Sequence, residues 1–559
     1  MLSKSKFLAD ACQLIARRST SSAAAILQPT STASACPFHA FTSRTRKNAN
    51  TSTATTTTTN NNSGAATVTS ALQCRPFEEI PTPRALPLIG TTLSILRFGG
   101  SPHIHEYCDY RHRQLGPVYR ETLEGVEALF VADSELIQQV YANEGRYPRH
   151  MVPEAWTIYN KEQNIKRGLF FMDGPEWQER RRALNNIFLR PKTVSDHVGV
   201  FNEVITDVVD NWSATAAKSN GQLTNLESEL YNWSIESLGA MILGRRLGCV
   251  APKATDGESS TGEAGSMHEF VNSVQQIFAE SAKMTMIPPK IASSLRLPVW
   301  QRFEKAAGEA LRLARKYVDD TRGLGLPDGA VGTETGRNAS LVSQLLESKI
   351  SAEELVRIVT DLFLAAADTT SHATQWAFYL LSRHPEAQQK VLEEVKNAVP
   401  GDGTDIPEDA LSQMPYIKAV IKETLRLYPV APFLTRILDQ DITLKGYRVP
   451  AGKLILMSLY TTGRDARNFP DPNVFRPERW LRENRGEAQA NSWACLPFGL
   501  GSRSCIGRRV AEVQMQFLLA RAVRRFQLMP GQKEEIGIHM RLITTPKSPI
   551  SLKLIPRDS

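Results

Sequence analysis

The chain has 559 residues, of which 42% are hydrophobic and 22% charged, so it carries enough apolar material to bury a large core. Its net charge of +8 would suit a polyanion, but residues 1–77 hold eight basic residues and one acid, which leaves only +1 for residues 78–559. Bulk charge therefore gives no reason to expect a nucleic acid partner. The seven cysteines show no CxxC pair and no zinc-ligand spacing, and their odd number argues against a disulfide framework.

Residues 1–77 are rich in Ser, Thr, Ala and Arg and almost free of acids, a composition typical of organelle transit peptides. The Thr/Asn tract 51–62 has nothing to bury and predicts disorder. No run of 18 apolar residues occurs, so we expect no membrane-spanning helix. We predict a cleaved leader over 1–77 and one folded domain over 78–559. An ordinary disordered tail is the alternative interpretation of the leader.

The folded domain is predicted to be mainly α with a small β region. Residues 118–131 alternate in a way that suggests short strands, whereas 133–440 show mostly helical periodicity. A long helix over 351–384 begins with a capping box of Ser351 and Glu354 and ends before Pro385. Its middle places Asp368 and Thr369 among alanines. We expect a groove there, in which the acid and the alcohol manage protons; a solvated polar pair is the alternative.

A second helix ends near Tyr428 and carries Glu423 and Arg426 three residues apart, on one face. By themselves they would be an ordinary exposed ion pair of little value. Lys418 and Lys422 lie about a quarter turn away, so these two cations are expected to face solvent. Solvated lysines without a partner are the alternative.

The most specific pattern is Phe498-Gly-x-Gly-x-Arg503-x-Cys505-x-Gly507, just before an apolar-periodic helix. The glycines allow tight turns and close approach to a flat ligand. A helix N-terminus with its N–H groups is expected to lower the pKa of the Cys505 thiol. A thiolate in this setting can ligate haem iron and favour O–O cleavage.

These motifs resemble those of the cytochrome P450 family. The resemblance implies a fold that holds haem b between the long central helix and the cysteine loop, with Cys505 as the axial iron ligand and dioxygen as co-substrate. It also implies a haem-contacting set, a proton-handling pair and a buried structural triad: Trp177, Arg181, Arg436, Phe498 and Arg503; Asp368 and Thr369; Glu423, Arg426 and Arg479. The family usually has Gly where this chain has Ala366.

The leader makes the chain similar to the mitochondrial branch of that family. This implies a place on the matrix side of the inner membrane, with peripheral membrane association. It also implies electron supply by an acidic ferredoxin and its NADPH-dependent reductase. The expected docking cations are Lys418, Lys422, Arg508 and Arg509.

Stretches between residues 84 and 190, namely 105–114, 147–150, 154–160 and 167–174, further resemble the ecdysteroid 2-hydroxylases of arthropods. That resemblance implies hydroxylation of 2-deoxyecdysone to ecdysone. It places the pocket roof at 152–171, where Glu154, Thr157, Tyr159 and Asn160 are expected to bind hydroxyls. The alternatives are another mitochondrial sterol or xenobiotic hydroxylase, a haem-thiolate isomerase or dehydratase, and a haem sensor.

Overall fold

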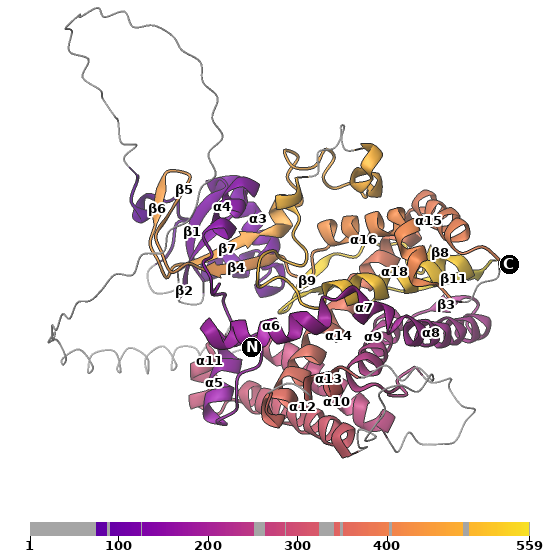
Figure 1. Ribbon diagram of the computed structural model, residues 1–559. Helices are drawn as coiled ribbons and strands as arrows, with labels where there is room; N and C mark the ends of the chain where they lie inside the picture. Colours follow the sequence, from indigo (N-terminus) through magenta and orange to yellow (C-terminus); the bar gives the residue numbers. More distant parts are fainter. Residues whose placement is uncertain are drawn as a thin grey trace, which may run out of the picture. The chain divides into compact units, whose positions relative to one another are not determined.

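Helices dominate the part of the chain that the computed structural model describes (Figure 1). The described residues are 74–86, 90–123, 126–250, 263–284, 287–323, 340–346, 350–401, 405–484 and 491–557. The predicted leader lies almost wholly outside them. Residues 70–559 form one unit. Among the described residues, no helix has both the length and the apolar character needed to cross a membrane.

The α-helices run from the first turn after the proline-rich segment to the C-terminal sheet. Their bounds are α2 Thr92–Arg97, α3 Ile104–Leu115, α4 Ser134–Ala142, α5 Glu154–Glu162, α6 Gly174–Phe188, α7 Pro191–Ser195, α8 Val198–Lys218, α9 Leu226–Leu243, α10 Glu263–Lys283, α11 Pro289–Ser294, α12 Pro298–Gly323, α13 Leu341–Leu346, α14 Ala352–Arg383, α15 Pro385–Ala398, α16 Pro415–Leu427, α17 Leu459–Thr462 and α18 Arg508–Arg525.

The β structure is small, as predicted. A four-stranded sheet has the order β1-β2-β7-β4, in which β2 pairs with β7 in parallel and the other pairs are antiparallel. Its first two strands are the ones predicted over 118–131. The strands are β1 Val118–Leu123, β2 Val126–Val131, β3 Gln222–Leu223, β4 Phe433–Ile437, β5 Ile442–Leu444, β6 Tyr447–Val449, β7 Leu454–Ser458, β8 Phe526–Pro530, β9 Ile538–Met540, β10 Thr544–Pro546 and β11 Leu552–Pro556.

Helix α14 is the central element of the helical part. The predicted capping box is present: Ser351 accepts from the Glu354 backbone N–H, and Glu354 accepts from that of Ser351. The helix packs against α9, α12, α16 and α18 and buries most of its length, with Trp376 and Phe378 inaccessible. Because it is buried on several sides, a polar residue on it must find a partner or line a cavity.

Helices α16 and α18 pack against each other, and the cysteine loop leads directly into α18. Pro415 starts α16 at a position where its missing N–H costs nothing, and the helix ends at Leu427, just before Tyr428 and Pro429. Helix α18 begins at Arg508, three residues after Cys505. Since α16 and α18 both pack on α14, the chain brings the two long-separated motifs to one region.

Candidate haem site and proton-handling residues

The cysteine loop is a tight turn that presents a thiol. Gly499 and Gly501 have φ of 66° and 74°, in the left-handed region that favours glycine, and a Cβ on Gly501 would lie 2.2 Å from the Glu144 carboxylate. The Cys505 N–H donates to the Phe498 carbonyl over 2.8 Å and closes the turn. The Cys505 side chain is exposed. The loop therefore offers sulfur to a ligand while its backbone is held.

The expected low pKa of Cys505 is wrong for this structure. Although Cys505 keeps an accessible surface, the protein packed around its sulfur disfavours the charged form and raises the pKa of the thiol; the Gly507 backbone N–H and the Arg181 charge only partly oppose this. Helix α18 starts at Arg508, so its first N–H groups belong to residues beyond the cysteine. A metal ion bound to the sulfur would favour the thiolate.

Three guanidinium groups, from α6, from β4 and from the cysteine loop itself, gather in this region. Arg181 on α6 donates to the Ser504 carbonyl over 2.6 Å. Arg503 lies 4.1 Å from the ring centroid of Trp177 and donates to the Met172 carbonyl and to Asp173. Arg436 on β4 pairs with Glu144 over 2.6 Å. Burial, together with the charges of Arg436 and Arg181, lowers the pKa of Arg503 to about 10.

His150 also belongs to this cluster, and sequence reasoning did not single it out. Neither ring nitrogen makes a hydrogen bond of ordinary geometry within the described residues. Burial, followed by the charges of Arg503 and Arg436, lowers its pKa to about 3. A buried imidazole among cations is costly unless an acceptor joins it. The cluster thus fits an anionic group with two carboxylates, such as the propionates of haem. The only sequence signal was its place in the 147–150 stretch.

Asp368 and Thr369 lie on α14 as expected but point in different directions. The Thr369 hydroxyl donates to the Ala365 carbonyl over 2.7 Å, and the side chains of Thr369 and Ala365 both have an accessible surface. Asp368 is 7% exposed and faces His372 and α9. Burial raises the pKa of the Asp368 carboxyl, and His372 opposes the shift. Consecutive helical residues are separated by about 100°, which explains the divergence.

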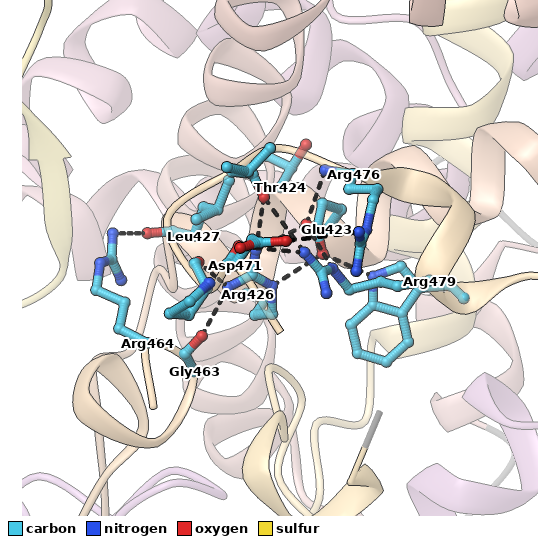
Figure 2. A network of polar contacts seen from close by, with 12 residues as sticks. Glu423, Thr424, Arg426, Leu427, Gly463, Arg464, Asp471, Arg476 and Arg479 are labelled. Carbon is cyan, nitrogen blue, oxygen red and sulfur yellow. Dashed lines mark hydrogen bonds and ion pairs between the residues drawn. The ribbon is translucent and has the colours of Figure 1, made fainter. Parts of the chain in front are cut away.

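The ion network around Glu423 is fully buried (Figure 2). Glu423 Oε1 accepts from Arg426 Nη2 over 2.7 Å and from Arg479 Nε over 2.9 Å. Trp480 Nε1 donates to Oε2 over 2.9 Å, a contact that the sequence did not indicate. Arg426 also donates to the carbonyls of Gly463 and Val474. The structure therefore brings the three predicted residues together and provides partners for their charges.

The four expected docking cations differ in exposure. Lys422, Arg508 and Arg509 are exposed, and Arg508 pairs with Glu512 over 3.1 Å. Lys418 is half-buried and lies near Glu394 of α15; burial raises the pKa of the Glu394 carboxyl, and the Lys418 charge partly opposes this. Lys418 is therefore less accessible than the other three cations. Lys422 Nζ lies 5.8 Å from the Trp480 ring centroid.

The expected pocket roof is partly corrected. Glu154 and Thr157 are exposed, and Glu154 pairs with Lys290 over 2.9 Å, so they point away from the interior. Asn160 is buried with both amide atoms lacking hydrogen bonds among the described residues. The sequence missed Arg357 of α14, which is 1% exposed and lies 5.0 Å from the ring centroid of Trp156.

Comparison with known proteins agrees with this geometry. A family model described as Cytochrome P450 matches residues 80–554. The Drosophila melanogaster protein "Cytochrome P450 315a1, mitochondrial" is 35% identical over 86% of this chain and 88% of its own length. The mitochondrial 25-hydroxyvitamin D-1 alpha hydroxylase of Rattus norvegicus is 32% identical over 82% and 90%. The mitochondrial cholesterol side-chain cleavage enzyme of Oncorhynchus mykiss is 30% identical over 83% and 88%.

A solved structure shares the fold. The crystal structure of the cytochrome P450DA heme domain aligns with a TM-score of 0.70 at 20% identity, over 86% of this chain and 97% of that one. At this identity the match speaks for the fold alone.

Proposed function

This chain belongs to the cytochrome P450 family, and from that premise we propose that it is a mitochondrial steroid hydroxylase which converts 2-deoxyecdysone to ecdysone. As a member of the family it is a monooxygenase that uses haem b and molecular oxygen. When bound, the haem activates dioxygen at its iron, and a thiolate ligand supplies electron density that favours O–O cleavage.

The residues of this chain divide the work of holding that group. Cys505 would hold the haem iron, because its loop is closed by backbone hydrogen bonds and its sulfur is exposed. Arg181, Arg436 and Arg503 bind the propionates, with Trp177 holding Arg503 in place and Phe498 beside the sulfur loop. Thr369 and Asp368 hold and move protons near the oxygen. The buried ion network of Glu423, Arg426 and Arg479 stabilises the chain beneath the cysteine loop.

Two observations support a polyhydroxylated steroid. The names of two mitochondrial relatives give 25-hydroxyvitamin D and cholesterol as their substrates; the first is derived from a sterol and the second is a sterol. The roof region of this chain also holds a buried amide, on Asn160, that has no hydrogen bond among the described residues, whereas the buried Arg357 has Asp361 as its ion-pair partner at 3.3 Å. Unpaired buried amides of this kind favour a ligand with several hydroxyls over a purely apolar one, since each unpaired group costs about 1–3 kcal/mol. The resemblance of 154–160 and 167–174 to ecdysteroid 2-hydroxylases selects the substrate within that class.

The mitochondrial proposal rests on the leader composition and on the mitochondrial names of the relatives. It implies a ferredoxin fed by an NADPH-dependent reductase, with peripheral association on the matrix side of the inner membrane. Residues 1–77 fused to a reporter should carry it into mitochondria. A reporter left in the cytosol would contradict both the location and the ferredoxin.

The deciding experiment uses the holoenzyme reconstituted with ferredoxin and reductase. 2-Deoxyecdysone should shift the haem spectrum toward high spin and yield ecdysone. Asn160→Leu should raise KM for this steroid by about fivefold, the cost of one lost hydrogen bond. If cholesterol or a xenobiotic is turned over and 2-deoxyecdysone is not, the alternative of another mitochondrial sterol or xenobiotic hydroxylase is correct.

The ligand assignment has its own test. Cys505→Ala should abolish the carbon monoxide band that thiolate-ligated haem gives on reduction. Cys495→Ala is the matched control, because it removes a thiol from the same segment, ten residues upstream. A band that survives in the Cys505 variant would assign the ligand elsewhere.

A further inference from the structure

A polar cavity borders the buried side of Asp368. It has a volume of about 410 Å³, with room for several water molecules. Helices α9, α10 and α14 and the segment after β9 line it. Its polar lining includes Glu227, Asn272, Gln275, Gln276, His372 and Arg541. Because Asn272 and Gln275 are exposed, its rim reaches solvent.

His372 lines this cavity together with Asp368. Its Nδ1 is 2.7 Å from the Asp368 carbonyl oxygen, so the Nδ1–H donates to the backbone one turn earlier. The same nitrogen lies 3.6 Å from Asp368 Oδ1. Its Nε2 is 3.7 Å from Glu227 Oε1 and makes no ordinary hydrogen bond among the described residues. Nδ1 therefore faces Asp368, and Nε2 faces Glu227.

Exposure differs sharply among these three residues. The side chain of Glu227 is 46% exposed, whereas that of His372 is 3% and that of Asp368 10% exposed. A proton from solvent can thus reach Glu227 directly, whereas on this side it reaches His372 and Asp368 through the cavity that both of them line.

The charges that face His372 favour proton binding. Burial acts to lower its pKa, but Glu227 from α9 and Asp368 from α14 together raise it above the ordinary value. The pKa of Glu227 is lowered, first by His372 and further by Arg541 from the segment after β9, whereas at Asp368 the same arginine only partly opposes the rise caused by burial. Tyr231 of α9 is buried and stays protonated, since burial and the two carboxylates raise its pKa. The facing residues of α10, namely Asn272, Gln275 and Gln276, do not titrate.

We propose that Glu227 and His372 relay protons from the polar cavity to Asp368. In one transfer, Nε2 gains a proton from the Glu227 carboxyl or a cavity water, and the N–H bond at Nδ1 breaks as an O–H bond forms at Asp368 Oδ1. The imidazole regains its starting tautomer when the ring rotates or when water carries a proton from Nε2 to Nδ1. The relay rests on the proposed monooxygenase function, in which Asp368 and Thr369 pass on protons that the reaction consumes.

The competing explanation is structural: His372 would merely tie α14 to α9. The two explanations differ in proton-dependent behaviour. His372→Gln preserves a hydrogen-bonding side chain of similar reach but cannot be protonated. Glu227→Gln removes the outer carboxylate at a half-exposed position, where folding is less at risk. His384→Gln is the matched control, because His384 also pairs with a glutamate, Glu386, over 3.1 Å but lies on the surface.

The test on the reconstituted holoenzyme measures product per NADPH and the solvent deuterium isotope effect on turnover. In His372→Gln and Glu227→Gln, product per NADPH should fall at least threefold and the isotope effect should rise. Haem content, the carbon monoxide band and the substrate-induced spectral shift should stay unchanged. The His384 variant should match the wild type. Unchanged coupling and isotope effect in both relay variants would overturn the relay.

An infrared measurement on the resting protein gives a readout without turnover. Because His372 lowers the pKa of Asp368, His372→Gln should increase the absorption of a protonated carboxyl at neutral pH, and Asp368→Asn should remove that band. If the band does not change, the two side chains are not coupled and the relay fails. This outcome is independent of which steroid is hydroxylated, so failure of the substrate proposal and failure of the relay are distinguishable.

Discussion

Two buried polar networks flank α14, and they are built differently. Around Glu423, both carboxylate oxygens accept hydrogen bonds from guanidinium, indole or backbone donors at 2.7–3.0 Å. Near Asp368, the His372 imidazole lies 3.6 Å from the Asp368 carboxylate and 3.7 Å from that of Glu227, and a cavity adjoins all three side chains. The first network is saturated with donors, whereas the second is loose and open to water.

The difference separates support from chemistry. A buried carboxylate with five good donors is held in place, so it can define the shape of the chain beneath the cysteine loop. A buried carboxylate with few donors has a raised pKa and can change its protonation state in a reaction. The predictions below test this contrast, in order of decreasing expected effect.

Glu423→Gln should cause the largest loss. It leaves Arg426 and Arg479 buried without their counter-charge, and breaking a buried pair in this way costs about 3–5 kcal/mol. Chemical denaturation followed by circular dichroism measures the change. Glu386→Gln is the control, because Glu386 is exposed in its pair with His384 and its loss should leave the unfolding curve unchanged. Equal stability of the two variants would refute the supporting role.

Thr369→Val should leave folding intact and lower product per electron by about tenfold, with the difference released as hydrogen peroxide, because the hydroxyl is needed to guide protons. Thr374→Val is a close match. Thr374 makes the same hydrogen bond to the carbonyl four residues earlier, over the same 2.7 Å, but is fully buried away from the site. If both variants uncouple equally, the effect comes from the helix and not from the hydroxyl.

Asp368→Asn should stabilise the fold at pH 7 by on the order of 1 kcal/mol while it impairs turnover, the opposite of Glu423→Gln in stability. The sign follows from linkage. Because the folded-state pKa of Asp368 is raised above its ordinary value of 3.8, the unfolded chain releases this proton more readily, and stability is lost as pH rises through the folded-state pKa.

The gain from Asp368→Asn should therefore be absent below pH 3.8 and grow toward neutral pH. Unfolding free energies of the variant and the wild type across that range measure it. A variant that is less stable at pH 7 would place Asp368 with Glu423 as a structural acid.

Lys422→Glu should have the smallest effect, a decrease of about threefold in ferredoxin-driven turnover that shrinks at high salt, since exposed charges are screened. Peroxide-driven turnover should not change. Lys161→Glu reverses a charge on another exposed helical position, in α5, and serves as the control. Equal losses in both assays would mean that α16 itself is damaged.

The residues of both networks were only partly predictable. Glu423, Arg426, Arg479 and Asp368 lie in short motifs whose spacing indicates a shared helix face or a helix interior. His372, Glu227 and Arg357 carry no such signal. A histidine or an arginine on a long apolar helix is ordinary until the neighbouring elements show how deeply it is buried and which groups face it. His150 was missed for the same reason.

The sequence by itself determined the helical periodicity, the capping box at Ser351 and Glu354, the strands over 118–131 and the cysteine loop, because each depends on residues within a few turns of one another. Only the tertiary structure decided which groups are charged. Burial raised the pKa of Cys505 against the local expectation, Lys418 came to lie against α15, and Glu154 and Thr157 turned to the surface. Desolvation and charge pairing depend on what packs nearby, and that information is spread over hundreds of residues.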